Sequence, residues 1–136
     1  MSRDCVFCRI VSRSEPADIV FESKSYLAFM DKYPQSAGHL QLIPKTHYHW
    51  IYELPDMGEI FSLAQKITHA IIPVLGADHI ALGTFGNEVP HAHIWIVPYY
   101  SKQYQIQEGR RSESRINQRQ KLYKLIFLRL AKEVFV

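Results

Sequence analysis

The chain has 136 residues, of which 47% are hydrophobic and 12% aromatic, a composition typical of one globular domain with a hydrophobic core. No stretch approaches the run of about 18 apolar residues that a membrane helix requires, and the N-terminus lacks the apolar segment of a secretory signal, so we expect a cytoplasmic protein without a membrane anchor. The formal net charge is +3, but residues 109–136 alone hold eight Lys or Arg against two Asp or Glu, so the cations cluster at the C-terminal end.

The N-terminal half alternates short apolar runs with turn residues, which predicts one short helix followed by three strands. Residues 5–11 are expected to form an amphipathic turn or helix that ends before Pro16, because the residue before a proline resists helical geometry. The three strands are predicted over residues 18–22, 25–31 and 39–44. Residues 45–54 show no pattern that assigns them to a helix or a strand.

The C-terminal half predicts two helices and two further strands. Residues 57–75 form a long helix, since apolar side chains recur at three- and four-residue steps, and Gly76 is placed to end it. Strands are predicted over residues 79–85 and 91–98, and the short loop between them indicates a hairpin. A final helix is expected over about residues 112–135, with one apolar stripe made by Ile116, Tyr123, Ile126, Phe127, Leu130 and Val134. The chain is therefore expected to be a single α+β domain spanning residues 1–136, with a five-stranded, mainly antiparallel sheet.

The predicted strand over residues 91–98 alternates strictly between two faces. Its core face consists of Ala92, Ile94, Ile96 and Pro98, and its opposite face presents His91, His93, Trp95 and Val97. The imidazoles of such a pair are about 6.5 Å apart along the strand. Exposed strand positions accept histidine without any function. A His-x-His pair beside the turn residues Gly86 and Asn87 nevertheless favours a functional site, because glycine lets the backbone approach a ligand.

Two chemistries fit this pair of histidines. Both imidazoles can bind one catalytic metal, with a third ligand elsewhere. Alternatively, one imidazole can attack phosphorus through Nε2 while a hydrogen bond from Nδ1–H fixes its tautomer, with backbone donors of residues 86–88 holding the phosphate oxygens. Separately, Cys5 and Cys8 have the spacing of half a tetrahedral zinc site, for which histidines are the plentiful further ligands. Two buried thiols or a redox pair would have the same spacing.

The run His91-Ala92-His93-Ile94-Trp95, after Gly-Asn-Glu-Val-Pro, resembles the signature of the histidine triad (HIT) family, in which histidines alternate with hydrophobic residues. Other segments of the chain also resemble HIT family sequences, and they occur in the same order along the chain. They are Cys5-Val-Phe-Cys8-Arg-Ile, Pro16-Ala-Asp-Ile-Val-Phe-Glu22, Leu27-Ala-Phe-Met-Asp31 and Pro34-Gln-Ser-Ala-Gly-His-Leu-Gln-Leu-Ile-Pro44-Lys-Thr-His47. The resemblance covers roughly residues 5–98 and leaves the C-terminal helix unaccounted for.

The resemblance implies a role for each candidate site residue. It implies that His93 is the nucleophile, that Asp31 binds the ribose hydroxyls, and that His39 supports the triad from behind. It implies that the base lies against Phe7, Ile10 and Phe29, and that Gly86, Asn87 and Glu88 bind the phosphate. In the zinc-containing members, a structural Zn²⁺ is bound by residues that match Cys5, Cys8, His47 and His91.

Trp95 departs from the family pattern. In the family, this position holds the third histidine of the triad, which hydrogen-bonds the scissile phosphate or the leaving group. An indole donates one hydrogen bond but can neither accept one nor carry a proton. Two functions follow from the resemblance. One is a hydrolase of nucleoside phosphoramidates or related nucleotide phosphoanhydrides that forms a nucleotidyl-histidine intermediate. The other is a nucleotide-binding or regulatory protein with little or no catalysis.

The partners implied by the resemblance are a purine nucleotide or nucleoside phosphoramidate and a second copy of the chain in a homodimer. The apolar stripe of the C-terminal helix is expected to pack on the domain or on the second subunit. This is favoured over a nucleic acid or a membrane surface, because an amphipathic stripe usually becomes buried.

Overall fold

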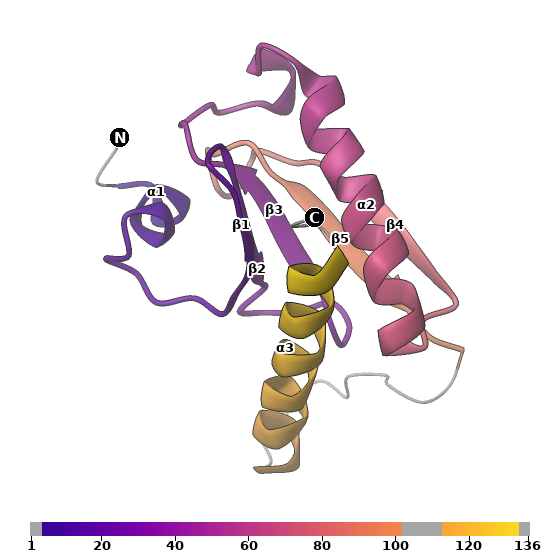
Figure 1. The fold of residues 1–136 in the computed structure, drawn as a ribbon. Coiled ribbons are helices and arrows are strands. Elements are labelled where there is room, and N and C mark those ends of the chain that lie inside the picture. The colour runs from indigo at the N-terminus through magenta and orange to yellow at the C-terminus, as the bar shows by residue number, and fades with distance from the viewer. Residues whose placement is uncertain (1–3, 102–112, 134–136) are drawn as a thin grey trace.

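Five antiparallel strands form one sheet in the order β1-β2-β3-β5-β4 (Figure 1). The computed structural model describes residues 4–101 and 113–133. The strands are β1 (Ile19–Glu22), β2 (Tyr26–Met30), β3 (Leu40–Pro44), β4 (His79–Gly83) and β5 (Ile94–Tyr99). The predicted five-stranded sheet and the predicted pairing of β4 with β5 are confirmed. This order places β5 inside the sheet and β4 at its edge.

Helices cover both faces of the sheet (Figure 1). α1 (Val6–Val11) lies on one face, and α2 (Met57–Leu75) and α3 (Glu113–Glu133) lie on the other, while η1 (Ile51–Glu53) is a short 3-10 turn before α2. α2 has the bounds that the sequence predicts. At its start the Asp56 side chain accepts a hydrogen bond from the Gly58 N–H at 2.8 Å, and at its end Gly76 has a left-handed φ of 67°.

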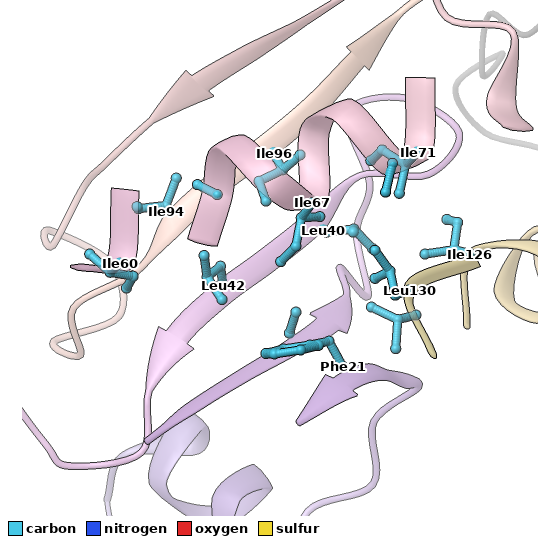
Figure 2. Packing of buried hydrophobic residues seen from close by; sticks show 14 of the residues in the cluster. Phe21, Leu40, Leu42, Ile60, Ile67, Ile71, Ile94, Ile96, Ile126 and Leu130 are labelled. Atoms are coloured by element: carbon cyan, nitrogen blue, oxygen red, sulfur yellow. The ribbon is translucent and has the colours of Figure 1, made fainter. Parts of the chain in front are cut away.

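The main core lies between the sheet and the helices α2 and α3 (Figure 2). Alternate side chains of the inner strands meet one face of α2 there; they are Leu40, Leu42, Ile94 and Ile96 from the sheet and Ile60, Ile67 and Ile71 from the helix. A second cluster lies between the opposite sheet face and α1, and it consists of Cys5, Phe7, Cys8, Ile10, Leu27, Phe29 and Ile43. Side chains that alternate along the strands therefore point either into the main core or toward the face that α1 covers, as the sequence predicts.

Ile67 belongs to the main core and has no exposed surface. Replacing it with alanine is expected to lower the free energy of unfolding by about 2–5 kcal/mol, because buried methyl groups are lost and a cavity remains. The measurement is urea unfolding followed by circular dichroism, with the exposed neighbour Lys66 replaced by alanine as the control. The control should stay within about 0.5 kcal/mol of the unchanged protein. A similarly small change for Ile67→Ala would contradict its place in the core.

β5 begins at Ile94, three residues later than the predicted start at His91. The reason is that the backbone before Ile94 forms hydrogen bonds outside the sheet. The Ala92 N–H, for example, donates to the carbonyl of Tyr48 at 2.6 Å. β4 also ends two residues before its predicted end, so the connection runs over residues 84–93. The predicted tight hairpin loop was wrong, although the pairing of the two strands was right.

The apolar stripe of α3 is narrower than the sequence predicts. Ile126 and Leu130 are fully buried, and Tyr123 packs partly against the main core. Phe127 was predicted in the stripe but is 43% exposed, because it follows Ile126 by one residue and so points about 100° away around the helix. Ser112 and Val134, and the side chain of Ile116, lie outside the part of the chain that the structure describes. Within residues 4–101 and 113–133, no helix is both long and apolar enough to cross a membrane.

Candidate active site

A cavity of about 1040 Å³ lies on the sheet face that α1 covers. Most of the predicted site residues meet in its lining; they are Phe7, Ile10, Phe29, Asp31, Asn87, Glu88, His93 and Trp95. Gly86, His39 and the four predicted metal ligands lie outside the lining. The cavity therefore combines apolar side chains from α1 and β2 with polar groups from the ends of β2 and β5.

His91 and His93 are buried, although the strand alternation predicted them on an open sheet surface. Their exposed fractions are 0% and 4%. The Phe7 ring of α1 covers both imidazoles, with its centroid 5.9 Å from the His91 ring and 5.6 Å from the His93 ring. The alternation of the strand could not predict this cover, because α1 comes from the other end of the chain.

The His93 side chain has one tautomer available. Its Nδ1 lies 2.6 Å from the carbonyl oxygen of His91, which can only accept a hydrogen bond, so Nδ1 carries the proton and donates it. The lone pair is therefore on Nε2, and the side chain lines the cavity. Burial lowers the pKa of His93 from its usual value of 6.5, which keeps the imidazole neutral at pH 7. A neutral imidazole with a lone pair on Nε2 is the form that acts as a nucleophile.

The four predicted metal ligands lie together. One ligand atom each from Cys5, Cys8, His47 and His91 falls within 4.8 Å of the others. Cys5 Sγ is 3.2 Å from His91 Nδ1, and Cys8 Sγ is 3.1 Å from His47 Nδ1. In a tetrahedral zinc site, bonds of about 2.3 Å to sulfur and 2.0–2.1 Å to nitrogen separate such atoms by roughly 3.5 Å. The donor set and its spacing therefore fit a tetrahedral zinc ion.

His91 connects the metal-ligand group to His93. Its Nε2 donates to the Pro44 carbonyl at 2.9 Å, so Nδ1 keeps its lone pair on the side of the two thiols. Burial lowers the pKa of His91 to about 4, which favours the neutral form that metals bind. The backbone carbonyl of the same residue accepts the hydrogen bond from His93. One residue therefore serves the metal-ligand group through its ring and the predicted nucleophile through its backbone.

Asp31 is held at the end of β2 by contacts on both carboxylate oxygens. Oδ2 accepts a hydrogen bond from Gln41 Nε2 at 2.6 Å, and Oδ1 accepts one from the Tyr33 N–H at 2.7 Å. The Nδ1 atom of His39 accepts from the Gln35 N–H, so its Nε2 carries the proton and faces Asp31 Oδ2 at 3.6 Å. Burial lowers the pKa of His39, and the nearby Asp31 charge opposes that shift. The result is a fixed acceptor group in the cavity wall, suited to ligand hydroxyls.

Trp95 lies between two other rings. Its ring centroid is 4.9 Å from that of His39 and 4.8 Å from that of Phe85. In the sheet it pairs with Gln41 of β3, and both side chains line the cavity. The indole therefore forms part of the cavity wall that also includes His93, and the buried His39 ring contacts it from outside the lining.

The residues of the predicted phosphate loop differ in their surroundings. Asn87 and Glu88 line the cavity, whereas Gly86 packs against Trp50. A Cβ atom at Gly86 would lie 2.6 Å from two atoms of the Trp50 ring, and the Gly86 carbonyl accepts a hydrogen bond from His49 Nε2 at 2.9 Å. The glycine is therefore required by close packing against an aromatic ring, and the two residues after it face the cavity.

Gln41 and Arg119 are two polar residues of the cavity lining that were not predicted. Gln41 is a polar residue between Leu40 and Leu42 in an otherwise apolar strand, and such an interruption is a signal that the sequence does contain. Arg119 lies on α3, and no local pattern distinguishes it from the other cations of residues 109–136. Only the folded arrangement brings it to the cavity.

A family profile described as HIT domain matches residues 12–102. An uncharacterised HIT-like protein of Methanocaldococcus jannaschii is 36% identical over 103 residues, which cover 71% of this chain and 79% of that protein. A protein of Schizosaccharomyces pombe named adenosine 5′-monophosphoramidase is 35% identical over 108 residues, which cover 77% of this chain and 81% of that protein. The crystal structure of a zinc-bound histidine triad family protein from Mycobacterium smegmatis matches with a TM-score of 0.76 and 27% identity, over 95% of this chain and 94% of that one.

Proposed function

Because the chain belongs to the HIT domain family, we propose that it hydrolyses nucleoside phosphoramidates or related nucleotide phosphoanhydrides through a nucleotidyl intermediate on His93. The observation that carries this proposal is the His93 imidazole, which is neutral, fixed through Nδ1 by a backbone carbonyl and part of the cavity lining. The name of the Schizosaccharomyces pombe relative supports a nucleoside phosphoramidate as the substrate class.

In the proposed reaction, His93 Nε2 attacks the α-phosphorus and forms an N–P bond as the bond to the leaving group breaks. The leaving amine departs with the bonding electron pair and takes a proton from solvent, since Trp95 carries none to give. The His93 ring is then a cation, and the His91 carbonyl stabilises it by accepting from Nδ1–H. Water next attacks phosphorus and gives up a proton to solvent as the N–P bond breaks, which releases the nucleoside monophosphate and returns His93 to its neutral form.

The cavity offers a surface for each part of a purine nucleotide. Apolar side chains for the base come from α1 and β2 and are Phe7, Ile10 and Phe29. The Phe7 and Phe29 rings meet edge to face with centroids 5.2 Å apart, which gives a rigid apolar wall. We place the ribose hydroxyls on Asp31 and the phosphate on backbone donors around Asn87 and Glu88.

We propose a structural zinc ion held by Cys5, Cys8, His47 and His91. Zinc with four protein ligands has no open position for a substrate, so the chemistry it supplies is a cross-link between chain segments. The ligands join the start of α1 and the segment after β3 to the residues before β5. This cross-link would fix the His91 backbone carbonyl and with it the orientation of the His93 ring.

The experiment that tests the proposed reaction is a single-turnover incubation with adenosine 5′-phosphoramidate, quenched in base and analysed by intact mass. We expect an adduct of one adenylyl group per chain, localised to His93 by fragmentation, because base preserves the N–P bond of a phosphohistidine. An adduct on any other residue would contradict the assignment of the nucleophile. Ammonia release without any adduct, at a rate that His93→Ala does not change, would indicate direct attack by water.

A nucleotide-binding protein with little or no turnover is the second candidate function. Trp95 favours it, because an indole beside the nucleophile cannot protonate a leaving group. The same incubation separates the two candidates. Nucleotide binding in calorimetry, combined with neither adduct nor ammonia release, would support the binding protein over the hydrolase.

The resemblance also leads us to infer a homodimer, and we further propose the cytoplasmic location that the sequence analysis predicts. β4 supports a dimer, since it is the edge strand of the described sheet and its Leu82 side chain is 43% exposed. An edge strand with an exposed apolar side chain is a surface that proteins usually cover.

A further inference from the structure

We propose that Arg119 of α3 is a positioning residue for the carboxylate of Asp31, so that the C-terminal helix forms part of the nucleotide site. This inference rests on the proposed function, in which Asp31 accepts hydrogen bonds from the ribose hydroxyls. It concerns a helix that lies beyond residues 12–102, the segment that the HIT domain profile matches. The role is one of positioning because Arg119 acts on the nucleotide through Asp31.

The Arg119 guanidinium connects α3 to two strands. Its Nη1 donates to the carbonyl of Asp31 at 2.9 Å, and its Nη2 donates to the carbonyl of Met30 at 3.5 Å. On its other side, Nε donates to Asp18 Oδ2 at 3.2 Å. Asp18 directly precedes β1, while Met30 and Asp31 stand at the end of β2. One side chain from α3 therefore bridges the two neighbouring strand ends that border the cavity.

Arg119 lines the cavity, yet all three of its nitrogen atoms are engaged by protein oxygens. The planar fork of a guanidinium suits such a set of fixed acceptors, and three of its five N–H donors are used on them. These contacts fix the guanidinium against the ends of β1 and β2, so that Arg119 braces this part of the cavity wall.

The brace acts at the residue whose orientation matters for ribose binding. The Asp31 N–H donates to the His39 carbonyl at 2.9 Å, and its side chain is held by Gln41 and by the Tyr33 N–H. Arg119 holds the remaining backbone group, the carbonyl. Without Arg119, the peptide that follows Asp31 gains freedom to rotate. The Tyr33 N–H contact then weakens, and the carboxylate loses its fixed direction.

This role differs in its consequence from a merely structural one. If Arg119 only docked the helix, its removal would loosen the whole site and would lower the affinity for every nucleotide equally. If Arg119 instead orients Asp31, its removal lowers the affinity only for ligands that have ribose hydroxyls. The ratio of two affinities, one with and one without those hydroxyls, therefore distinguishes the two roles.

The test measures by calorimetry, on the full chain, the affinities for AMP and for 2′,3′-dideoxyadenosine 5′-monophosphate. The unchanged protein is expected to prefer AMP by roughly tenfold or more, since hydrogen bonds to a charged acceptor are lost with the hydroxyls. Arg119→Ala should reduce that preference to about twofold or less. Arg119→Lys should give an intermediate preference, because an ammonium lacks the planar fork. The control Lys124→Ala changes an exposed cation of the same helix and should keep the full preference.

Both ligands are measured on the same preparation, so any unfolded fraction cancels from the ratio. Asp18→Asn is a second variant that weakens only one contact of Arg119, and it should lower the preference for AMP less than Arg119→Ala does. An Arg119→Ala protein that keeps the full preference, or that loses affinity for both ligands equally, would overturn the inference. An unchanged protein that binds both ligands alike, or neither, would instead overturn the proposed role of Asp31 and the inference that rests on it.

Discussion

Replacing His93 with alanine is expected to lower the rate of the first chemical step by roughly 10⁴- to 10⁶-fold, because the group that forms the covalent bond is removed. The measurement is single-turnover ammonia release from adenosine 5′-phosphoramidate with the protein in excess. This design isolates the attack on phosphorus, so a slow later step does not hide the effect. His69→Ala is the matched control, since His69 is exposed on α2 and lies outside the cavity lining. The control is expected to retain the full rate.

The His93→Ala protein should keep its melting temperature within a few degrees and should still bind AMP, because the ring is not part of the main core. These two measurements separate a chemical loss from unfolding. Full turnover by His93→Ala would refute the covalent mechanism. An equal loss in His69→Ala would mean that the assay reports on general stability instead of on the nucleophile.

Replacing Cys8 with serine is expected to remove most of the bound zinc and to lower the melting temperature by roughly 10 °C or more. Cys8 is the choice because its sulfur contacts both imidazoles of the metal-ligand group, His47 at 3.1 Å and His91 at 3.5 Å. Serine keeps the size of the side chain but supplies a poor ligand for zinc. The measurements are metal content by atomic emission and thermal unfolding by circular dichroism. Thr46→Ala, an exposed change next to His47, is the control and should alter neither quantity.

A strong chelator provides the complementary experiment. It should lower the melting temperature of the unchanged protein toward that of Cys8→Ser and should leave the variant itself unaffected. A purified protein with one zinc per chain satisfies the prediction. A protein without metal, whose melting temperature a chelator does not change, would contradict it and would leave the two thiols as buried apolar groups or a redox pair.

The fold was largely predictable because its signals are local. The steps of apolar residues in α2 and the two-residue alternation in β2 and β5 report directly on which face packs, and the structure confirms them. The start of β5 was not predictable in this way. Residues 91–93 continue the alternation of the strand, but Ala92 bonds to the Tyr48 carbonyl, in a segment that shows no pattern of its own.

The candidate site was predictable only where a motif or the family resemblance pointed to it. The spacing of Cys5 and Cys8 is local, whereas His47 and His91 join them from distant parts of the chain and were predicted from the resemblance alone. Arg119 has neither signal, because it lies beyond the motif-bearing segment in a helix rich in similar cations. Phe127 shows the opposite kind of error: it was predicted in the apolar stripe of the C-terminal helix, but its side chain is exposed and points away from the core.

The position of β5 between β3 and β4 has a consequence for how the protein is made. β3 and β5 pair through Leu40 and Ile96, so α2 and β4 must be synthesised before the centre of the sheet can close. Pairings between such distant residues form slowly, and in a nascent chain they must wait for the later segment to leave the ribosome. The thiols of Cys5 and Cys8 can meet His91 only after α2 and β4 have been synthesised. We therefore expect the cavity and the metal-ligand group to assemble late in folding, after the hairpin of β1 and β2.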